Sequence, residues 1–278
     1  ESFLRFINQL LKSAGIRVYL FGNYDKDFAM RVAREIRAAL PAGRVVSAGY
    51  SRQQVYSPEQ NTTLVFNTDL PVEDLGMLYL FAAQEPTIDN EASGRVLSQH
   101  LRNRAFGTLR TEEQLGYAAG GMAGKLQDHP FLGFYIQTPV KPPVQMLERF
   151  DHFTQEYGEM LKEISAEEFE NLKSGVLTQL SEPPKNLAEE ASPFVSDWNR
   201  ENYQFNTRAK LITAIEAVSL DDIRSYYEDT VLTEMPRRIL VQMKGERWAK
   251  EPFAVIKGAQ IVDSVEVFHK AMPVQPIE

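Results

Sequence analysis

The order of strand-like and helical segments is the feature that most constrains the fold of this 278-residue chain. From residue 44 onward, five runs have the composition of buried or half-buried strands: residues 44–50, 61–67, 116–122, 131–138 and 237–243. The first four precede a long helical block, with helices also predicted at about 71–85 and 89–105, and the fifth follows it. Two clusters of strands around a helical block favour the α+β class, with a mainly antiparallel sheet covered by helices on one face.

The helical block is marked by amphipathic spacing and by repeated start signals. From Pro143 onward, six apolar residues recur at spacings of three, four and seven, which predicts one long amphipathic helix: Val144, Leu147, Phe150, Tyr157, Leu161 and Ile164. Three capping pairs follow, and each predicts the start of a further helix. They are Ser165 with Glu168, Asn186 with Glu189, and Ser219 with Asp222.

The first 45 residues have too little core to form a domain alone. Helical spacing of apolar residues marks their beginning, Ile16–Phe21 is predicted to be a buried strand, and Asp25 caps a helix that stops at Pro41. We interpret residues 1–45 as the end of a preceding domain, residues 46–245 as the main domain, and residues 246–278 as a tail that forms a terminal strand or an interface.

Composition excludes several classes of function. With 38 acidic and 30 basic residues, the net charge of −8 gives no broad surface for neutralising phosphates, so we expect no nucleic-acid partner. No apolar run approaches the roughly 18 residues needed to span a bilayer, so we expect no membrane partner. The absence of cysteine excludes disulfides and thiol catalysis, and it fits the periplasm and the cytosol equally well.

The segment Leu109–Tyr117 gathers a guanidinium, two carboxylates, an amide and a phenol at one junction between a helix and a strand. In this position Arg110 and Tyr117 could point at one group beside the sheet, where both would donate hydrogen bonds. The alternative is structural. In that case Arg110 pairs with Glu112 or Glu113 on the surface, and Tyr117 fills a half-buried strand position.

With its flanks, this motif resembles the closing segment of the pitrilysin and insulin-degrading enzyme family of inverzincin zinc peptidases. The matching landmarks follow the family's order: Phe106–Tyr117, Lys141–Pro143, Glu182–Leu187 and Pro236–Arg238. The resemblance implies an α/β roll preceded by the end of another such domain, in a C-terminal section whose zinc motif lies in an absent N-terminal half. It also implies that Arg110 and Tyr117 are catalytic residues, which hold the scissile carbonyl and stabilise the oxyanion opposite zinc.

We expect no metal site within the chain itself. The His-x-x-Glu-His signature of inverzincins is absent. None of the four histidines (His100, His129, His152 and His269) lies three or four residues from another, so one helix face cannot supply two zinc ligands. We interpret His100 and His152 as helix-surface or partly packed residues. The resemblance to the family implies zinc in the full-length enzyme, with ligands outside this sequence.

The glycine-rich run after Tyr117 is a candidate peptide-binding edge. Gly120 and Gly121 lack side chains, so a substrate strand could approach the backbone closely and add to the sheet through main-chain bonds. The glycines do not have Gly-x-Gly-x-x-Gly spacing and no phosphate-loop lysine follows, which argues against nucleotide binding.

The sequence thus predicts the non-zinc-binding section of a zinc metalloendopeptidase that hydrolyses peptides in a closed chamber, inactive by itself. Its expected partners are the N-terminal half of the same enzyme and peptide substrates, with a homodimer as a candidate assembly. Two alternatives stay open: an inactive structural or assembly subunit of the same fold, and a stand-alone peptide-binding module. The expected location is the periplasm, with the cytoplasm as the alternative.

Overall fold

The computed structural model describes residues 2–13, 16–40, 59–126 and 128–271. The chain divides into two compact units. The N-terminal unit contains residues 1–53 and 183–207, and the sheet unit contains residues 54–182 and 208–278. Each unit is described by itself below.

A six-stranded sheet with the order β3-β4-β2-β5-β1-β6 forms the centre of the sheet unit. The strands are β1 (Thr63–Asp69), β2 (Leu75–Ala82), β3 (Ala118–Leu126), β4 (His129–Thr138), β5 (Arg237–Lys244) and β6 (Gln260–Ile261). The pairings β3–β4, β4–β2 and β2–β5 are antiparallel, whereas β1 is parallel to both β5 and β6. The predicted α+β class with a mainly antiparallel sheet is confirmed.

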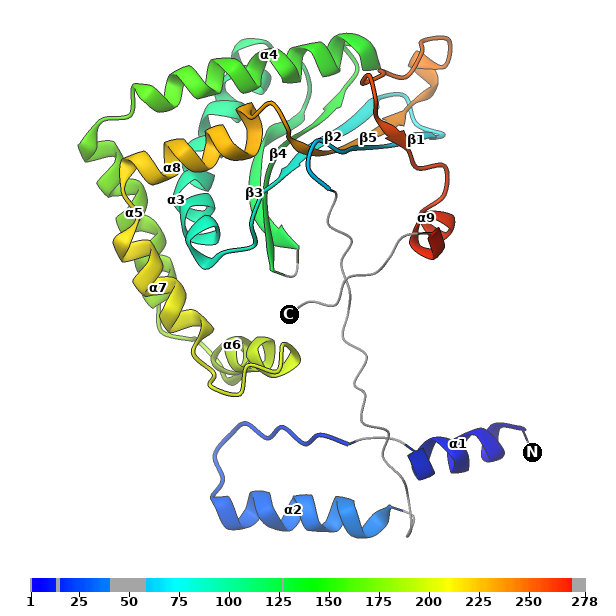
Figure 1. The fold of residues 1–278 in the computed structure, drawn as a ribbon, viewed down its shortest axis with the longest axis vertical. Coiled ribbons are helices and arrows are strands. Elements are labelled where there is room, and N and C mark those ends of the chain that lie inside the picture. The colour runs from blue at the N-terminus through cyan, green and yellow to red at the C-terminus, as the bar shows by residue number, and fades with distance from the viewer. Residues whose placement is uncertain (1, 14–15, 41–58, 127, 272–278) are drawn as a thin grey trace. The chain divides into compact units, whose positions relative to one another are not determined.

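Helices cover one face of this sheet (Figure 1). The helices of the sheet unit are α3 (Ile88–Ala105), α4 (Pro143–Lys162), α5 (Ala166–Ser181), α7 (Thr207–Ala217) and α8 (Leu220–Tyr227), with π-helical turns η1 (Phe106–Glu112) and η2 (Glu228–Leu232). Of these helices, α3 and α4 contact the strands directly. Ser165 and Ser219 accept hydrogen bonds from the backbone N–H groups of Glu168 and Asp222, so both predicted caps are confirmed. Between sheet and helices, aromatic residues such as Phe134 and Phe153 meet edge to face, with 5.3 Å between their ring centroids.

The predicted helix at about 71–85 is wrong, because this segment contains β2. Leu75, Met77, Tyr79 and Phe81 are buried against the helices and alternate with half-buried residues on the opposite face. Because Leu78 and Leu80 on that opposite face are also apolar, the segment is a continuous apolar run without the polar alternation that marks a half-exposed strand. Such a run cannot be distinguished from a buried helix by its periodicity.

The strand register assigns each residue of the sheet to one of its two faces. Leu78 of β2 lies opposite Tyr135 of β4 and Val241 of β5, so all three point away from the covering helices. In the same register Gly120 of β3 lies opposite Tyr135. We call this surface the open face. It is only partly exposed and largely apolar, and Tyr135 is 37 % exposed.

The segment after residue 245 adds a strand to the sheet. After the 3-10 turn η3 (Glu246–Trp248), the chain returns to place β6 beside β1, and α9 (Val265–Ala271) follows. We call the segment between η3 and β6 the C-terminal return. The buried side-chain amide of Gln242 binds it: Nε2 donates to the carbonyl of Ala254 and Oε1 accepts from the N–H of Ala254, both at 2.9 Å. The expected terminal strand is confirmed, and the domain boundaries near 45 and 245 stay predictions.

The N-terminal unit contains α1 (Ser2–Ser13), α2 (Lys26–Ala39) and α6 (Leu187–Asn199). Asp25 caps α2 and Asn186 caps α6, as predicted. The predicted strand at Ile16–Phe21 is wrong, because this segment forms no ladder with other described residues. Its aromatic side chains pack instead on α6, with Tyr19 at 5.4 Å from Trp198 and Phe21 at 5.5 Å from Phe194 between ring centroids.

Large apolar side chains remain uncovered on α1 and α2. Phe3 is 70 % exposed, Leu4 66 % and Phe6 59 %, and α2 contains no buried residue. Helices with one apolar side normally bury it against another element. The predicted strand at 44–50 lies outside the described residues. None of the described helices is long and apolar enough to cross a membrane.

Candidate functional site

The motif segment forms η1, a π-helical continuation of α3 that ends at the beginning of the β3–β4 hairpin. Leu109 and Leu115 are buried and anchor the segment in the core. The N–H of Leu115 donates to the carbonyl of Leu109 at 3.0 Å, and Gln114 has a left-handed backbone with φ of 54°. Leu115 in turn accepts a short hydrogen bond from the hydroxyl of Thr138 on β4. Short π-helical turns inside α-helices are frequent at functional sites.

Arg110 and Tyr117 are in direct contact. Nε of Arg110 donates to the backbone carbonyl of Tyr117 at 2.9 Å, and the guanidinium carbon lies 5.3 Å from the centre of the phenol ring. On its other side the guanidinium lies 4.7 Å from the ring centre of Phe106. One backbone bond and two aromatic rings thus orient Arg110, which keeps its remaining N–H groups available for another acceptor.

The structural alternative for these two residues does not fit the geometry. Tyr117 is 86 % exposed and precedes β3, so it does not fill a half-buried strand position. The carboxylate of Glu113 is bound by Arg149 of α4, and no ion pair between Arg110 and Glu112 or Glu113 is found among the described residues. The exposed phenol and the guanidinium therefore present two donors together at the surface of the sheet unit.

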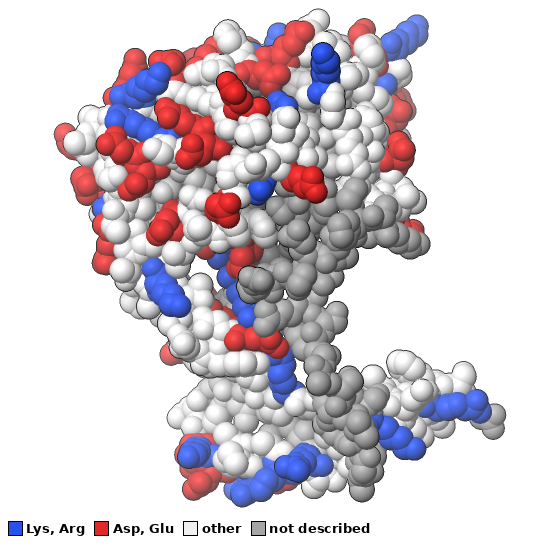
Figure 2. All heavy atoms as spheres, in the orientation of Figure 1, with Lys and Arg blue, Asp and Glu red and all other residues white. Residues whose placement is uncertain are grey.

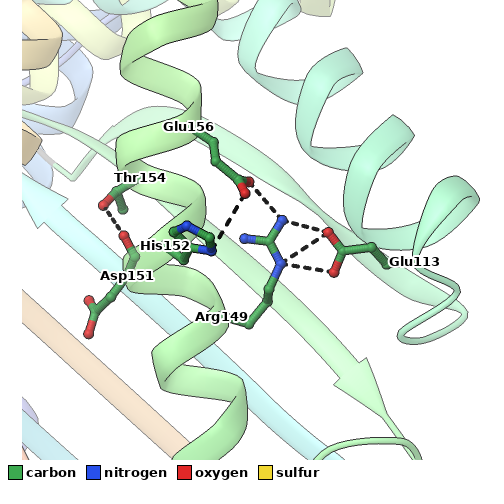
Figure 3. Close-up of polar contacts among 6 residues, drawn as sticks. All are labelled: Glu113, Arg149, Asp151, His152, Thr154 and Glu156. Atoms are coloured by element: carbon green, nitrogen blue, oxygen red, sulfur yellow. Dashed lines mark hydrogen bonds and ion pairs between the residues drawn. The ribbon is translucent and has the colours of Figure 1, made fainter.

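Figure 3 shows the ion pairs that surround Arg149 on α4. Nε of Arg149 lies 3.0 and 2.8 Å from the two carboxylate oxygens of Glu113, and its Nη2 lies 2.8 Å from Glu156. The hydrogen bonds that Arg149 donates to Glu113, and the one it donates to Glu156, raise the pKa of Arg149. His152, which is 73 % exposed, lies 3.6 Å from Glu156 at the edge of this group.

The sequence indicated Glu113 only as a partner of Arg110 in the structural alternative, and Arg149 was missed. A signal was present, because Arg149 lies three residues after Met146 and four before Phe153, both of which are buried in the apolar stripe of α4. A cation at that spacing requires an acidic partner on an adjoining element.

The two predicted substrate-binding glycines point to opposite faces of the sheet. A Cβ atom on Gly121 would lie 2.7 Å from the side chain of Leu101 and 2.9 Å from its carbonyl oxygen, so this glycine permits close packing of α3 on β3. On the open face, a Cβ atom on Gly120 would lie 3.1 Å from the phenol oxygen of Tyr135, and Gly120 is itself buried. Packing of α3 therefore explains Gly121, whereas at Gly120 the missing side chain makes room for the ring of Tyr135.

His100 is buried and differs from the expected helix-surface residue. Its Nδ1 lies 2.8 Å from the hydroxyl of Tyr157, and its Nε2 accepts a hydrogen bond from Nε of Arg104 at 3.2 Å. Burial, and then the nearby charge of Arg104, lowers the pKa of His100 to about 4. His100 is therefore a neutral core residue at pH 7.

The described residues contain no group of three or more His, Asp or Glu side chains that could hold a metal ion. His100 lies 3.8 Å from Glu168, but its ring nitrogens are occupied by Tyr157 and Arg104. This part of the chain does not fit zinc.

Charges of both signs are mixed on the surface. In the view of Figure 2, acidic and basic side chains are interspersed over the sheet unit. This distribution agrees with the net charge of −8. A surface of this kind lacks the single-sign field that attracts a polyanion.

Three comparisons with known proteins show what this chain is similar to. Residues 96–195 match the family "PQQ synthase PqqF-like, C-terminal lobe domain 4". Protease 3 of Salmonella typhi is 24 % identical over 267 residues, which cover 96 % of this chain and 27 % of that protein. The chain thus spans about a quarter of the length of this curated relative.

Solved structures show the same fold. The structure of pitrilysin matches with a TM-score of 0.82 and 24 % identity, covering 91 % of this chain and 27 % of pitrilysin. The periplasmic protease PqqL from Escherichia coli matches with a TM-score of 0.54 and 14 % identity, over 87 % of this chain and 30 % of that protein. These matches confirm the resemblance drawn from the motif residues, and the chain has the fold of the C-terminal part of a pitrilysin-type peptidase.

Proposed function

We propose that this chain is the non-zinc-binding C-terminal section of a zinc metalloendopeptidase that cleaves peptides in a closed chamber. The observation that carries this proposal is the contact between Arg110 and Tyr117, which presents a guanidinium and an exposed phenol side by side. Relatives named Protease 3 and "Putative zinc protease mug138" support the reaction class and the metal.

In the proposed mechanism, Arg110 and Tyr117 bind the oxygen of the scissile peptide carbonyl. The phenol O–H and a free guanidinium N–H donate to this oxygen, and both bonds strengthen as negative charge develops on it in the transition state. Phe106 and the carbonyl of Tyr117 fix the direction of the guanidinium, so little reorganisation is needed when substrate binds. Zinc, held by residues outside this chain, supplies an activated water and polarises the carbonyl when bound.

The edge of β3 that pairs with no other described strand, together with the open face, is proposed to bind the peptide backbone. β3 is the last strand in the order of the described sheet, and Gly120 adds no side chain to the open face next to Tyr135. An extended peptide that pairs with this edge would gain main-chain hydrogen bonds that do not depend on its sequence. In the full-length protein, Gly120→Val should raise KM for peptides and lower the melting temperature somewhat, because the new side chain meets the phenol of Tyr135. Unchanged KM would remove Gly120 from the site.

The N-terminal half of the same enzyme is the proposed partner. The uncovered apolar residues Phe3, Leu4 and Phe6 of α1 support an adjoining surface, because exposed apolar patches mark interaction sites. A homodimer is a second candidate assembly. The proposed location is the periplasm, supported by the structural match to PqqL, a periplasmic protease.

The test uses the full-length protein that contains this chain and a quenched fluorescent peptide. Tyr117→Phe removes one donor and should lower kcat roughly 100-fold with little change in KM, because the lost bond acts mainly in the transition state. Arg110→Lys should also lower kcat, since an ammonium cannot keep the directed N–H geometry. A melting curve for each variant checks the fold.

The other outcomes identify the two alternative functions. A full-length protein that binds zinc but does not cleave peptide, with a wild-type assembly state, supports the inactive structural subunit. Saturable peptide binding by this chain alone supports the stand-alone binding module. Zinc-dependent cleavage by this chain alone contradicts the proposal.

A further inference from the structure

Arg149 connects two elements that otherwise belong to different parts of the fold. It lies on α4, whereas Glu113 is the first residue after η1, 36 positions earlier in the chain. Glu156, the second partner of Arg149, lies on α4 itself. Of the two ion pairs that Arg149 makes in Figure 3, only the one to Glu113 therefore links the end of η1 to α4.

The Glu113–Arg149 pair has the geometry of a rigid link. Both carboxylate oxygens of Glu113 accept hydrogen bonds from Arg149, at distances of 2.5 to 3.0 Å. A bidentate arginine–carboxylate pair fixes direction as well as distance. The Arg149 side chain is only 12 % exposed, and its guanidinium lies 5.6 Å from the ring centre of the core residue Phe153. Solvent therefore competes little for the arginine.

The backbone next to this link controls where Arg110 and Tyr117 lie. The N–H of Glu113 closes the last turn of η1 by donating to the carbonyl of Thr108 at 3.0 Å. Arg110 is three residues before Glu113, and Tyr117 is four residues after it. Displacing Glu113 would therefore move one or both members of the Arg110–Tyr117 contact. π-helical turns are rare and hold fewer favourable contacts than α-helix, so such a turn needs tertiary support.

We propose that Glu113 and Arg149 are positioning residues, whose bidentate pair holds the end of η1 against α4 and so keeps Arg110 and Tyr117 in contact. Arg149 does not touch substrate in this role. The catalytic consequence rests on the function proposed for Arg110 and Tyr117, whereas the effect on η1 is a property of the fold and can be measured separately.

The experiment compares four variants of the full-length protein by hydrogen exchange and by peptide kinetics. Glu113→Gln and Arg149→Gln each break the link, and the double variant tests whether the two act as one unit. Glu156→Gln is the matched control, because it removes the other carboxylate bound to Arg149 and leaves the link to η1 intact. Melting temperatures report any general loss of fold.

We expect faster hydrogen exchange at the backbone N–H groups of residues 113 and 115 in both single variants. Their kcat should fall roughly 10- to 100-fold, as small displacements of substrate-positioning groups do, while KM changes much less. The double variant should be no slower than the worse single variant, because the pair is already broken. Glu156→Gln should keep near wild-type exchange at these two amides.

Three results overturn the proposal. Unchanged exchange at Glu113 and Leu115 in both single variants means that the pair does not hold η1, whatever the activity. If Glu113→Gln and Arg149→Gln speed exchange but keep wild-type kcat, while the separate variant Tyr117→Phe lowers kcat, the pair has no positioning role and the proposed function stands. Full activity of Tyr117→Phe refutes the proposed function, and the catalytic part of this inference fails with it.

Discussion

Replacing His100 should change how the stability of the chain depends on pH. The imidazole is 3 % exposed, accepts a hydrogen bond from Arg104 through Nε2 and lies at 2.8 Å from the hydroxyl of Tyr157 through Nδ1. A proton on Nε2 would remove the acceptor for Arg104 and place a second positive charge beside it. His100→Gln keeps a neutral polar side chain of similar length that does not titrate.

The sign and size of the effect follow from the two pKa values. Burial lowers the pKa of His100 from 6.5 to about 4 in the folded chain, so the unfolded chain takes up the proton first as pH falls. The contribution of His100 to the free energy of unfolding is therefore constant above pH 6.5, and the free energy falls as pH drops from 6.5 to about 4. At about 1.4 kcal/mol for each pH unit between the two values, the loss is about 3 kcal/mol.

Urea unfolding of the wild type and of His100→Gln at several pH values between 4 and 7.5 measures this effect. The wild type should lose about 3 kcal/mol more than the variant over this interval, because both lose the contributions of carboxylates equally. NMR titration of the imidazole C–H signal gives the pKa directly. A folded-state pKa near 6.5, or parallel pH profiles for the two proteins, would refute the reasoning.

Three further predictions concern packing, the C-terminal return and capping. Gly121→Ala should lower the free energy of unfolding in urea by about 1 to 3 kcal/mol, because the new Cβ meets the backbone of α3. Gly120→Ala should lower it much less, since only the end of the Tyr135 side chain must shift. Gln242→Leu removes both hydrogen bonds to Ala254 and should speed tryptic cleavage after Lys257, with unchanged cleavage showing that other contacts hold the return. Ser219→Ala should lower the free energy of unfolding by about 1 kcal/mol, because the capping box is lost. Urea unfolding followed by circular dichroism measures this, and the same free energy of unfolding for variant and wild type would contradict the contribution of the cap.

Local signals predicted much of the fold. Caps such as Asp25 and Ser219 act within three residues, and their side chains bond the backbone as the sequence indicated. The hairpin of β3 and β4 was also predictable, because it joins two neighbouring apolar strands through a loop with turn residues. In contrast, β2 was taken for a helix. Its identity as a strand depends on pairing with β4 and β5, and β5 is more than 150 residues away.

The candidate site was predictable in its residues and not in its support. The chemistry of Arg110 and Tyr117 is visible in the sequence, and the resemblance to a family assigns them a role. Their orientation depends on η1, a π-helical turn without a sequence signature in this chain, and on Arg149, which arrives from α4. The two adjacent glycines also could not be separated by sequence, since alternation across a strand places neighbours on opposite faces only once the strand is assigned.

The position of β6 beside β1 has a practical consequence for handling the protein. β1 is parallel to β5 on one side, and on the other its backbone groups at Leu64 and Val65 are paired with β6. A recombinant fragment that stops near residue 245 would leave this edge of β1 unpaired. Unpaired sheet edges recruit strands from other molecules. Fragments shortened in this way should precipitate or self-associate, and fragments that extend beyond Ile261 should remain dispersed.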